Sequence, residues 1–145
     1  MTEFRLSGWW EGKTHHYPLR VYYADTDAAG VVYHGTYLDF AERARTEMMR
    51  LLASEPTWRP GDRRSAFVVR ACEIDYKRSA MLDDLLTVRS CVVALGGASF
   101  RIGQEIWRDH ALLVRLGLTL VCVRDVGRPV RIPAGLREKM TGLLS

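Results

Sequence analysis

The residues best suited to chemistry lie within residues 20–46, in the string RVYYADTDAAGVVYHGTYLDFAERART. A strand-like run there ends in a turn that carries Asp25 and Asp27. Tyr23 precedes these carboxylates, and His34 stands just before an amphipathic helix. A pair of carboxylates, a histidine and several tyrosines therefore gather where we expect a sheet to pass into a helix.

Asp27 offers either acid–base or nucleophilic chemistry at this junction. A carboxylate is ionised at neutral pH, so it can activate a water molecule or attack an activated acyl carbon directly. The first N–H groups of a helix have no partner within the helix, and they carry a partial positive charge. Such donors can polarise a carbonyl group and stabilise the oxyanion that forms on it. A thioester suits this kind of site, because a thiolate leaves without a strong general acid.

Structural interpretations of the same residues are also open. An aspartate in a turn is more often a capping or Asx-turn residue than a catalyst. His34 can satisfy a backbone group, and the tyrosines can pack in the core or in an interface. Several familiar catalytic motifs are absent from the sequence: GxSxG, the Walker loop, GxGxxG and HExxH. The residues alone do not decide between the two roles.

The elements that must position these side chains can be predicted from periodicity. Tyr17–Ala24 is rich in tyrosine and valine and predicts a first strand. Residues 25–30 predict a turn, and Tyr37–Leu52 carries apolar residues at helical spacing. Ser54–Arg64, with two prolines and a glycine, predicts a loop.

From residue 65 onward the apolar period changes to two, which predicts four more strands in hairpin order. In the first of these we expect one face to carry Val68, Cys72, Ile74 and Tyr76. The later strands alternate around residues 86–94, 100–106 and 112–122, and residues 134–144 predict a short final helix. The fold class is therefore α+β: a five-stranded antiparallel sheet that wraps around one long helix. One helix leaves sheet edges uncovered, so we expect a homodimer or homotetramer.

Length and composition bound the function. A chain of 145 residues with 48% apolar and 26% charged residues is typical of one globular domain. We divide it into an N-terminal extension, residues 1–16, and a single domain, residues 17–145. The extension carries Trp9 and Trp10, and its pair His15–His16 is expected at the surface. The net charge of +4 comes without a nucleic-acid-binding pattern, so we expect no nucleic-acid partner.

The remaining composition indicates a cytoplasmic protein. No apolar run approaches the length of a membrane span, and the N-terminus does not read as a signal peptide. The cysteines are odd in number, and each lies in a strand-like run: Cys72, Cys91 and Cys122. We interpret them as small buried hydrophobic residues rather than disulfides, nucleophiles or metal ligands.

The string VYYADTDAAGVVYHGTYLDFAERARTEMMR closely resembles the YbgC-type, Tol–Pal-associated acyl-CoA thioesterases, within the hydroxybenzoyl-CoA thioesterase family of hot-dog proteins. The resemblance continues through AFVVRACEIDY, LDDLLTV and LVCV, and covers about residues 17–125. It implies a hot-dog fold and hydrolysis of acyl-CoA at a site between two subunits. It implies no cofactor or metal, because CoA is part of the substrate. A peripheral association with the cell-envelope Tol–Pal system would also follow from it.

The resemblance carries specific residues into the site. The family's catalytic aspartate falls on Asp27, and the tyrosine and histidine of the YbgC type fall on Tyr23 and His34. The amide that polarises the carbonyl falls near His34. Charge and position suggest four side chains for the CoA phosphates: Lys77, Arg78, Arg128 and Arg131. Related chains often have a proline in the loop where this one reads KRSA, so acyl selectivity does not transfer.

Two other functions stay open on the same scaffold. One is an enoyl-CoA hydratase or dehydratase, although such proteins typically pair a histidine with an acid at the helix entrance. The other is a non-catalytic scaffold that binds acyl-CoA and a protein partner, with Trp9 and Trp10 as the partner-binding residues.

Overall fold

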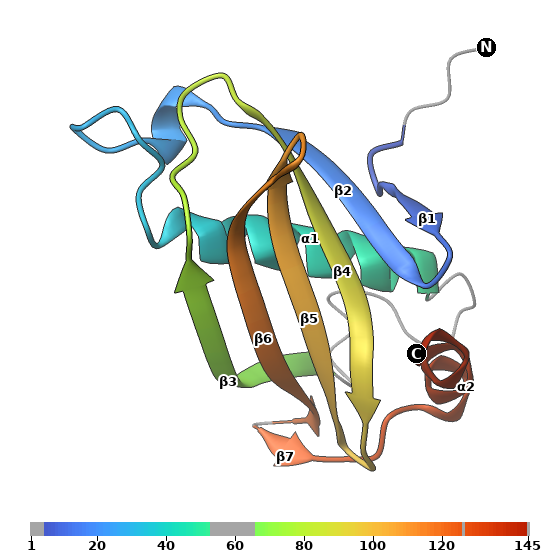
Figure 1. Cartoon of the computed structure of the whole chain (residues 1–145). Coiled ribbons are helices and arrows are strands. Elements are labelled where there is room, and N and C mark those ends of the chain that lie inside the picture. Colours follow the sequence, from blue (N-terminus) through green and yellow to red (C-terminus); the bar gives the residue numbers. More distant parts are fainter. Residues whose placement is uncertain (1–4, 53–65, 126, 145) are drawn as a thin grey trace.

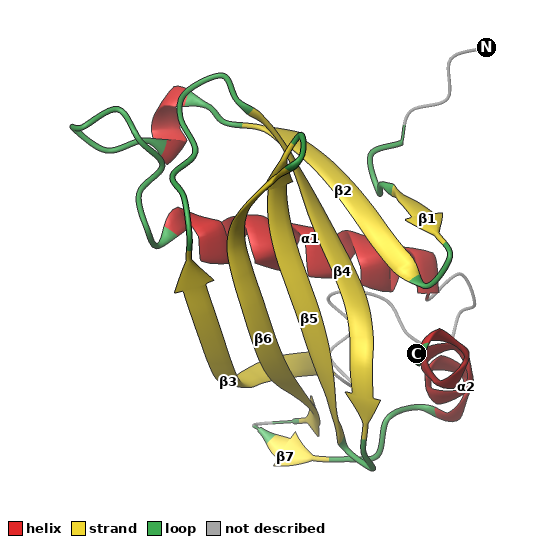
Figure 2. Ribbon diagram, viewed as in Figure 1, coloured by secondary structure: helices red, strands yellow, loops and turns green. Residues whose placement is uncertain are grey.

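The helix α1 (Thr36–Leu52) forms the centre of the molecule, and an antiparallel sheet curls around it (Figure 1). The computed structural model describes residues 5–52, 66–125 and 127–144. Within these residues a second helix, α2 (Ala134–Leu143), packs near the C-terminal end of α1 (Figure 2). The predicted loop Ser54–Arg64 lies outside the described residues.

The sheet has seven strands in the order β1-β2-β4-β5-β6-β3, with β7 paired to β6. Their bounds are Trp9–Glu11 for β1, Thr14–Arg20 for β2, Ala66–Tyr76 for β3, Leu85–Leu95 for β4, Ser99–Arg108 for β5, Ala111–Arg124 for β6 and Arg128–Pro129 for β7. Every pairing between them is antiparallel. β1 and the 11-residue β3 therefore form the two edges.

The core lies between α1 and the concave face of the sheet. The buried residues of α1 recur at helical spacing: Tyr37, Phe40, Ala41, Ala44, Met48, Met49 and Leu52. Alternate residues of the central strands meet them, among them Leu86, Val88, Ile102, Ile106 and Leu116. The predicted α+β class, the helix and the five main strands are confirmed, and the strand count is corrected from five to seven by the short β1 and β7.

The first strand begins and ends earlier than its tyrosine content predicts. β2 ends at Arg20, and Tyr23–Asp25 forms a 3₁₀ turn, η1. Polar side chains close that turn: the Tyr22 N–H donates to the Asp25 carboxylate at 2.8 Å, and the Thr26 hydroxyl donates to the Tyr23 carbonyl at 2.9 Å. Local hydrogen bonds from Asp and Thr thus override strand propensity.

The predicted exposure of His15 and His16 is wrong. Residues 9–16 add β1 and the start of β2 to the sheet, so the boundary placed at residue 16 falls inside a strand. His15 is fully buried and His16 nearly so, and their rings pack against Trp10 and Trp9 respectively. The two tryptophans therefore contact the histidines of the adjacent strand instead of extending from the domain.

The expected face of β3 is wrong at one end because of a β-bulge. The register against β6 shifts between Val69 and Ala71. Since paired residues share a face, Val69 lies on the helix side with its partner Leu120, and Val68 lies on the opposite side. A strict alternation could not reveal this extra residue. The burial expected for Cys72 is also wrong, because that thiol is exposed, whereas Cys91 is partly buried and Cys122 is buried.

Candidate active site

Asp27 lies in a tight hydrogen-bonded turn that follows η1. The Asp27 N–H donates to the Val31 carbonyl at 2.9 Å, and the Gly30 N–H donates to the Asp27 carbonyl at 3.0 Å. Gly30 has a φ of 82°, a left-handed conformation that costs glycine little. One oxygen of the Asp27 carboxylate accepts the Ala29 N–H at 2.9 Å, which is an Asx-turn contact. The side chain is exposed, so its second oxygen stays open to water or substrate.

The N-terminus of α1 lies directly after this turn. The Tyr33 N–H donates to the Asp25 carbonyl, and the Thr36 N–H donates to the Tyr33 carbonyl. Within the described part of the chain, the N–H groups of His34 and Gly35 donate to no acceptor. His34 is exposed, its ring centroid is 4.3 Å from that of Tyr33, and its carbonyl accepts the Tyr76 hydroxyl at 2.9 Å. Unpaired amides at a helix start are suitable donors for a developing oxyanion.

Several tyrosines surround this end of α1, but they differ in exposure. Tyr23 on η1 is 82% exposed and Tyr33 is 50% exposed, whereas Tyr37 is buried. The Tyr37 hydroxyl accepts the Ala80 N–H at 2.9 Å, and burial raises the pKa of this phenol. Burial also raises the pKa of Tyr76. Both phenols therefore stay protonated at neutral pH and act as hydrogen-bonding groups.

The segment after β3 joins the site to the sheet. The Val32 N–H donates to the Ala80 carbonyl at 2.9 Å, and Val31 forms a bridge with Met81. Together with the Tyr37 contact, these bonds hold residues 77–84 against the turn that carries Asp27. The loop that begins with Lys77 and Arg78 consequently lies at the same end of the sheet as the turn of Asp27 and His34. The loop after β3 and the segment before α1 lie together at that end (Figure 1).

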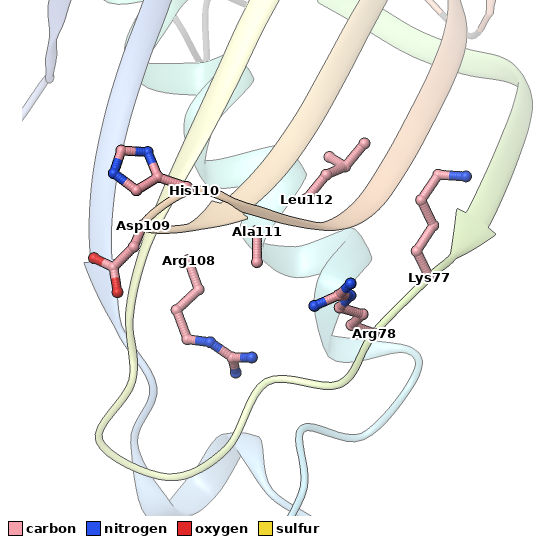
Figure 3. A pocket seen from close by; sticks show the side chains of 7 residues that line it. All are labelled: Lys77, Arg78, Arg108, Asp109, His110, Ala111 and Leu112. Atoms are coloured by element: carbon pink, nitrogen blue, oxygen red, sulfur yellow. The ribbon is translucent and has the colours of Figure 1, made fainter.

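Lys77 and Arg78 line an open pocket of about 920 Å³ (Figure 3). Its other lining residues come from the β5–β6 hairpin: Arg108, Asp109, His110, Ala111 and Leu112. Lys77 pairs with Asp75 at 2.9 Å, and Arg108 pairs with Asp84 at 2.7 Å. Residues 108–110 had no role in the site predicted from the sequence. Arg108 can be placed beside Lys77 only when the strand order is known.

Arg128 and Arg131 lie at the other end of the sheet. Arg128 belongs to β7, and the residue after Arg131 donates its N–H to the Gly97 carbonyl in the β4–β5 hairpin. β6 has 14 residues, and at about 3.3 Å per residue it separates the two ends by roughly 45 Å along the strand. A single chain therefore brings Tyr23, Asp27, His34, Lys77 and Arg78 to one end and leaves both of these arginines at the other.

No group of three or more His, Cys, Asp or Glu side chains within the described residues could hold a metal ion. In that same part of the chain, no helix is long and apolar enough to cross a membrane.

A curled antiparallel sheet around one helix, with polar groups at the helix N-terminus, defines the hot-dog class of proteins. The sequence model of the thioesterase superfamily matches residues 29–115. The chain is 44% identical over 119 residues to the acyl-CoA thioesterase YbgC of Haemophilus influenzae, covering 81% of this chain and 87% of that protein. It is 42% identical over 115 residues to the acyl-CoA thioester hydrolase YbgC of Escherichia coli, covering 74% and 80% of the two chains.

A solved structure gives the same result. The probable thioesterase from Bartonella henselae superposes with a TM-score of 0.73 at 38% identity, covering 83% of this chain and 98% of that one. The protein therefore belongs to the thioesterase superfamily and has the hot-dog fold, as the sequence resemblance implied. The roles of Tyr23, Asp27 and His34 stay predictions.

Proposed function

We propose that the protein is an acyl-CoA thioesterase that hydrolyses an acyl-CoA to a free carboxylic acid and CoA without a cofactor. The observation that carries the proposal is the N-terminus of α1, where unpaired N–H groups of His34 and Gly35 lie just after the turn that presents the Asp27 carboxylate. The names of the relatives at 42–44% identity support the substrate class.

In this proposal the thioester carbonyl oxygen accepts hydrogen bonds from the N–H groups of His34 and Gly35. Asp27 then acts on the polarised carbon in one of two ways. It can remove a proton from a water molecule that attacks the carbon, or it can attack directly and form an anhydride that water cleaves. Both routes consume one water molecule and release CoA as the thiol. The Tyr23 hydroxyl and the His34 imidazole are the groups that would orient the water and the departing sulfur.

We further propose that a second copy completes the site. β3 is an edge strand of 11 residues, and Val68 and Val69 on it are 45% and 46% exposed. A long edge strand with unpaired backbone groups is a surface for antiparallel pairing. When two copies of β3 pair in this way, the end of one sheet lies beside the opposite end of the other. Arg128 and Arg131 of one copy would then approach Lys77 and Arg78 of its partner and share the phosphates of CoA.

The proposed setting follows from the resemblance and from the cysteines. The three cysteines are free, which suits the reducing cytoplasm that we expect for this enzyme. A peripheral association with the Tol–Pal system rests on the resemblance alone. A homodimer is the smallest assembly that the β3 argument requires, and a homotetramer would contain two such pairs.

The test is a free-thiol release assay over acyl-CoA substrates that differ in chain length and aromaticity. We expect Asp27→Asn to lower kcat by about 10²–10⁴-fold, the range for losing a general base. The matched control is Asp39→Asn, which removes an equally exposed carboxylate from the first turn of α1. Full activity of Asp27→Asn would remove the mechanism. Water addition to an enoyl-CoA without thiol release would indicate a hydratase, and tight acyl-CoA binding without turnover would indicate a scaffold.

A further inference from the structure

A buried glutamine on β5 links the sheet to α1 through a network of hydrogen bonds. Gln104 is 0% exposed although its neighbours on the helix side of the sheet are apolar. Its side-chain N–H₂ group donates to the Ala41 carbonyl at 3.0 Å and to the Ser90 hydroxyl at 2.9 Å. Ser90 is also 0% exposed. Both donors are used, so the carbonyl oxygen of Gln104 has a fixed direction.

That carbonyl oxygen accepts a hydrogen bond from the Arg45 guanidinium at 2.9 Å. Arg45 lies on α1 among residues that face the core, and burial lowers its pKa, which the charge of Glu42 partly opposes. An arginine nevertheless remains charged at neutral pH. Within the described residues the guanidinium donates only to Gln104, so most of its five N–H groups have no protein acceptor. A neutral amide fixes the position of the cation without neutralising it.

The side chains of β3 connect this cation to the candidate active site. Cys72 and Tyr76 pair with Leu118 and Val114 of β6, which are core residues, so both face the helix side of the sheet. Both are nevertheless exposed, Tyr76 by 44%. Tyr76 reaches the His34 carbonyl at one end of this strip, and Cys72 lies near Arg45 at the other end.

The length of the strip can be estimated in two ways. Four residues separate Tyr76 from Cys72, which is about 13 Å along a strand. Along α1, the guanidinium lies near the level of Ala41, since both bind Gln104. Seven residues from His34 to Ala41 rise about 10 Å. An extended acyl group of medium length, held at the His34 amide, spans this distance.

We propose that Arg45, oriented by Gln104, determines acyl specificity by binding a carboxylate at the far end of a medium-length acyl group. The proposal rests on the proposed function, because it uses the same acyl site. A guanidinium that is already partly desolvated and held in place pays little further cost to bind a carboxylate, and its parallel N–H groups match the two oxygens. A methyl end would leave the same cation beside apolar atoms, which is unfavourable.

The experiment compares matched substrates in pairs: hexanoyl-CoA with adipoyl-CoA, octanoyl-CoA with suberoyl-CoA, and decanoyl-CoA with sebacoyl-CoA. We expect kcat/KM to favour the carboxylated member of at least one pair by about tenfold or more, the scale of a hydrogen bond between charged groups. Arg45→Met, which keeps an unbranched side chain, should reverse that preference by raising kcat/KM for the methyl-ended substrate and lowering it for the carboxylated one. Arg45→Lys should restore part of the preference.

Two controls separate specificity from structure. Arg43→Met removes an exposed arginine from the same helix and should leave the substrate ratio unchanged. If Arg45 served only to hold α1 on the sheet, Arg45→Met would lower the thermal midpoint and reduce turnover of both substrates by the same factor. That result, or equal ratios in the wild type and Arg45→Met, would overturn the inference while the thioesterase activity stood.

The inference also has a test that does not need turnover. If no acyl-CoA were hydrolysed, the proposed function would fail, and calorimetric titration with suberoyl-CoA and octanoyl-CoA would take its place. A tighter Kd for suberoyl-CoA that is lost in Arg45→Met would support the role of Arg45 in binding. Equal Kd values for the two ligands would refute it.

Discussion

The two sides of α1 differ in how completely they are covered. Toward β4 and β5 the helix meets residues that are at most 2% exposed, such as Val88, Ile102 and Ile106. Toward β3 the helix-side residues Val69 and Tyr76 are 46% and 44% exposed, and Tyr76 meets Tyr37 of the helix. We call these the closed side and the open side. The closed side supplies the packing that stabilises the domain, and the open side leaves the helix N-terminus and its amides accessible.

The two edges of the sheet differ in the same way. β1 has only three residues, and it ends at Glu11, whose carboxylate pairs with His16 at 3.0 Å. β3 has 11 residues and exposed valines on both of its faces. Short edge strands resist pairing, whereas long edge strands with unpaired backbone groups invite it. The open side of α1 and the open edge of the sheet are therefore the same strand, which joins the accessible site to the surface that would hold a second copy.

We expect the closed side of α1 to contribute most of the packing energy that stabilises the fold. Phe40 is 0% exposed and meets Tyr37 edge-to-face with 6.1 Å between the ring centroids. Phe40→Ala should lower the free energy of unfolding by about 3–5 kcal/mol, the usual cost of an aromatic cavity. Urea denaturation measures this loss. Leu38→Ala, at a position 41% exposed on the same helix, should cost no more than about 0.5 kcal/mol. Similar losses in both variants would contradict the distinction.

The second prediction concerns the open edge. Val68→Lys combined with Val69→Lys places charge on both faces of β3, and it should dissociate the dimer while each chain stays folded. Because the arginines that we propose to bind the CoA phosphates would leave the site, we expect kcat/KM to fall by at least about a hundredfold, as it does when reacting groups lose alignment. Sedimentation velocity and thiol release measure the two effects. Val93→Lys is the control, since Val93 is 53% exposed on the interior strand β4. A monomeric wild type would refute the prediction.

The fold was predictable because most of its rules are local. Helical spacing placed α1 within one residue, and period-two alternation located β3 to β6. The predictions that were wrong concern features that depend on contacts between residues distant in sequence. The bulge near Val69 needs the β6 register, and the burial of His15 needs the carbonyl of Ser7 and the ring of Trp10. Tyrosine content extended the first strand past Arg20 because the Asp25 turn competes with strand propensity.

The candidate site was predictable only in part. The Asp27 turn and the helix start are contiguous in sequence, so their proximity follows from one short segment. The separation of Lys77 and Arg78 from Arg128 and Arg131 depends on the length of β6 and could not be derived from charge. Gln104 and Arg45 were missed because a single glutamine in a strand and an arginine in a helix look like surface residues. Only the crossing of α1 over β5 brings them together.

A smaller effect tests whether the open side positions the helix amides. The Tyr76 hydroxyl donates to the His34 carbonyl and so fixes the plane of the 34–35 peptide, which carries the Gly35 N–H. Tyr76→Phe removes one hydrogen bond worth about 0.5–1.5 kcal/mol, so kcat should fall by roughly 2- to 12-fold with little change in stability. Steady-state kinetics and thermal melting measure both. Tyr17→Phe, on β2, is the control and should not alter kcat. A fall in stability without a fall in kcat would assign Tyr76 a packing role only.

The smallest expected effect is the pH dependence of stability that arises from the buried histidines of β2. Burial lowers the pKa of His15 from 6.5, even though its Nε2–H donates to the Ser7 carbonyl at 2.6 Å and Glu47 lies near. Its Nδ1 is buried without a partner, so protonation there would create an unsatisfied donor. Burial also lowers the pKa of His16.

Below pH 6.5 the unfolded chain therefore binds more protons than the folded chain. The free energy of unfolding should fall as the pH drops below this value and rise again as the pH is raised. His15→Gln keeps a donor for the Ser7 carbonyl and removes the titration. The difference in unfolding free energy between about pH 7.5 and about pH 5.5 should then be smaller in His15→Gln than in the wild type, and His110→Gln should leave it unchanged. His110 is the matched control because it is exposed. Identical pH dependence in wild type and His15→Gln would show that burial of this imidazole does not couple folding to proton binding.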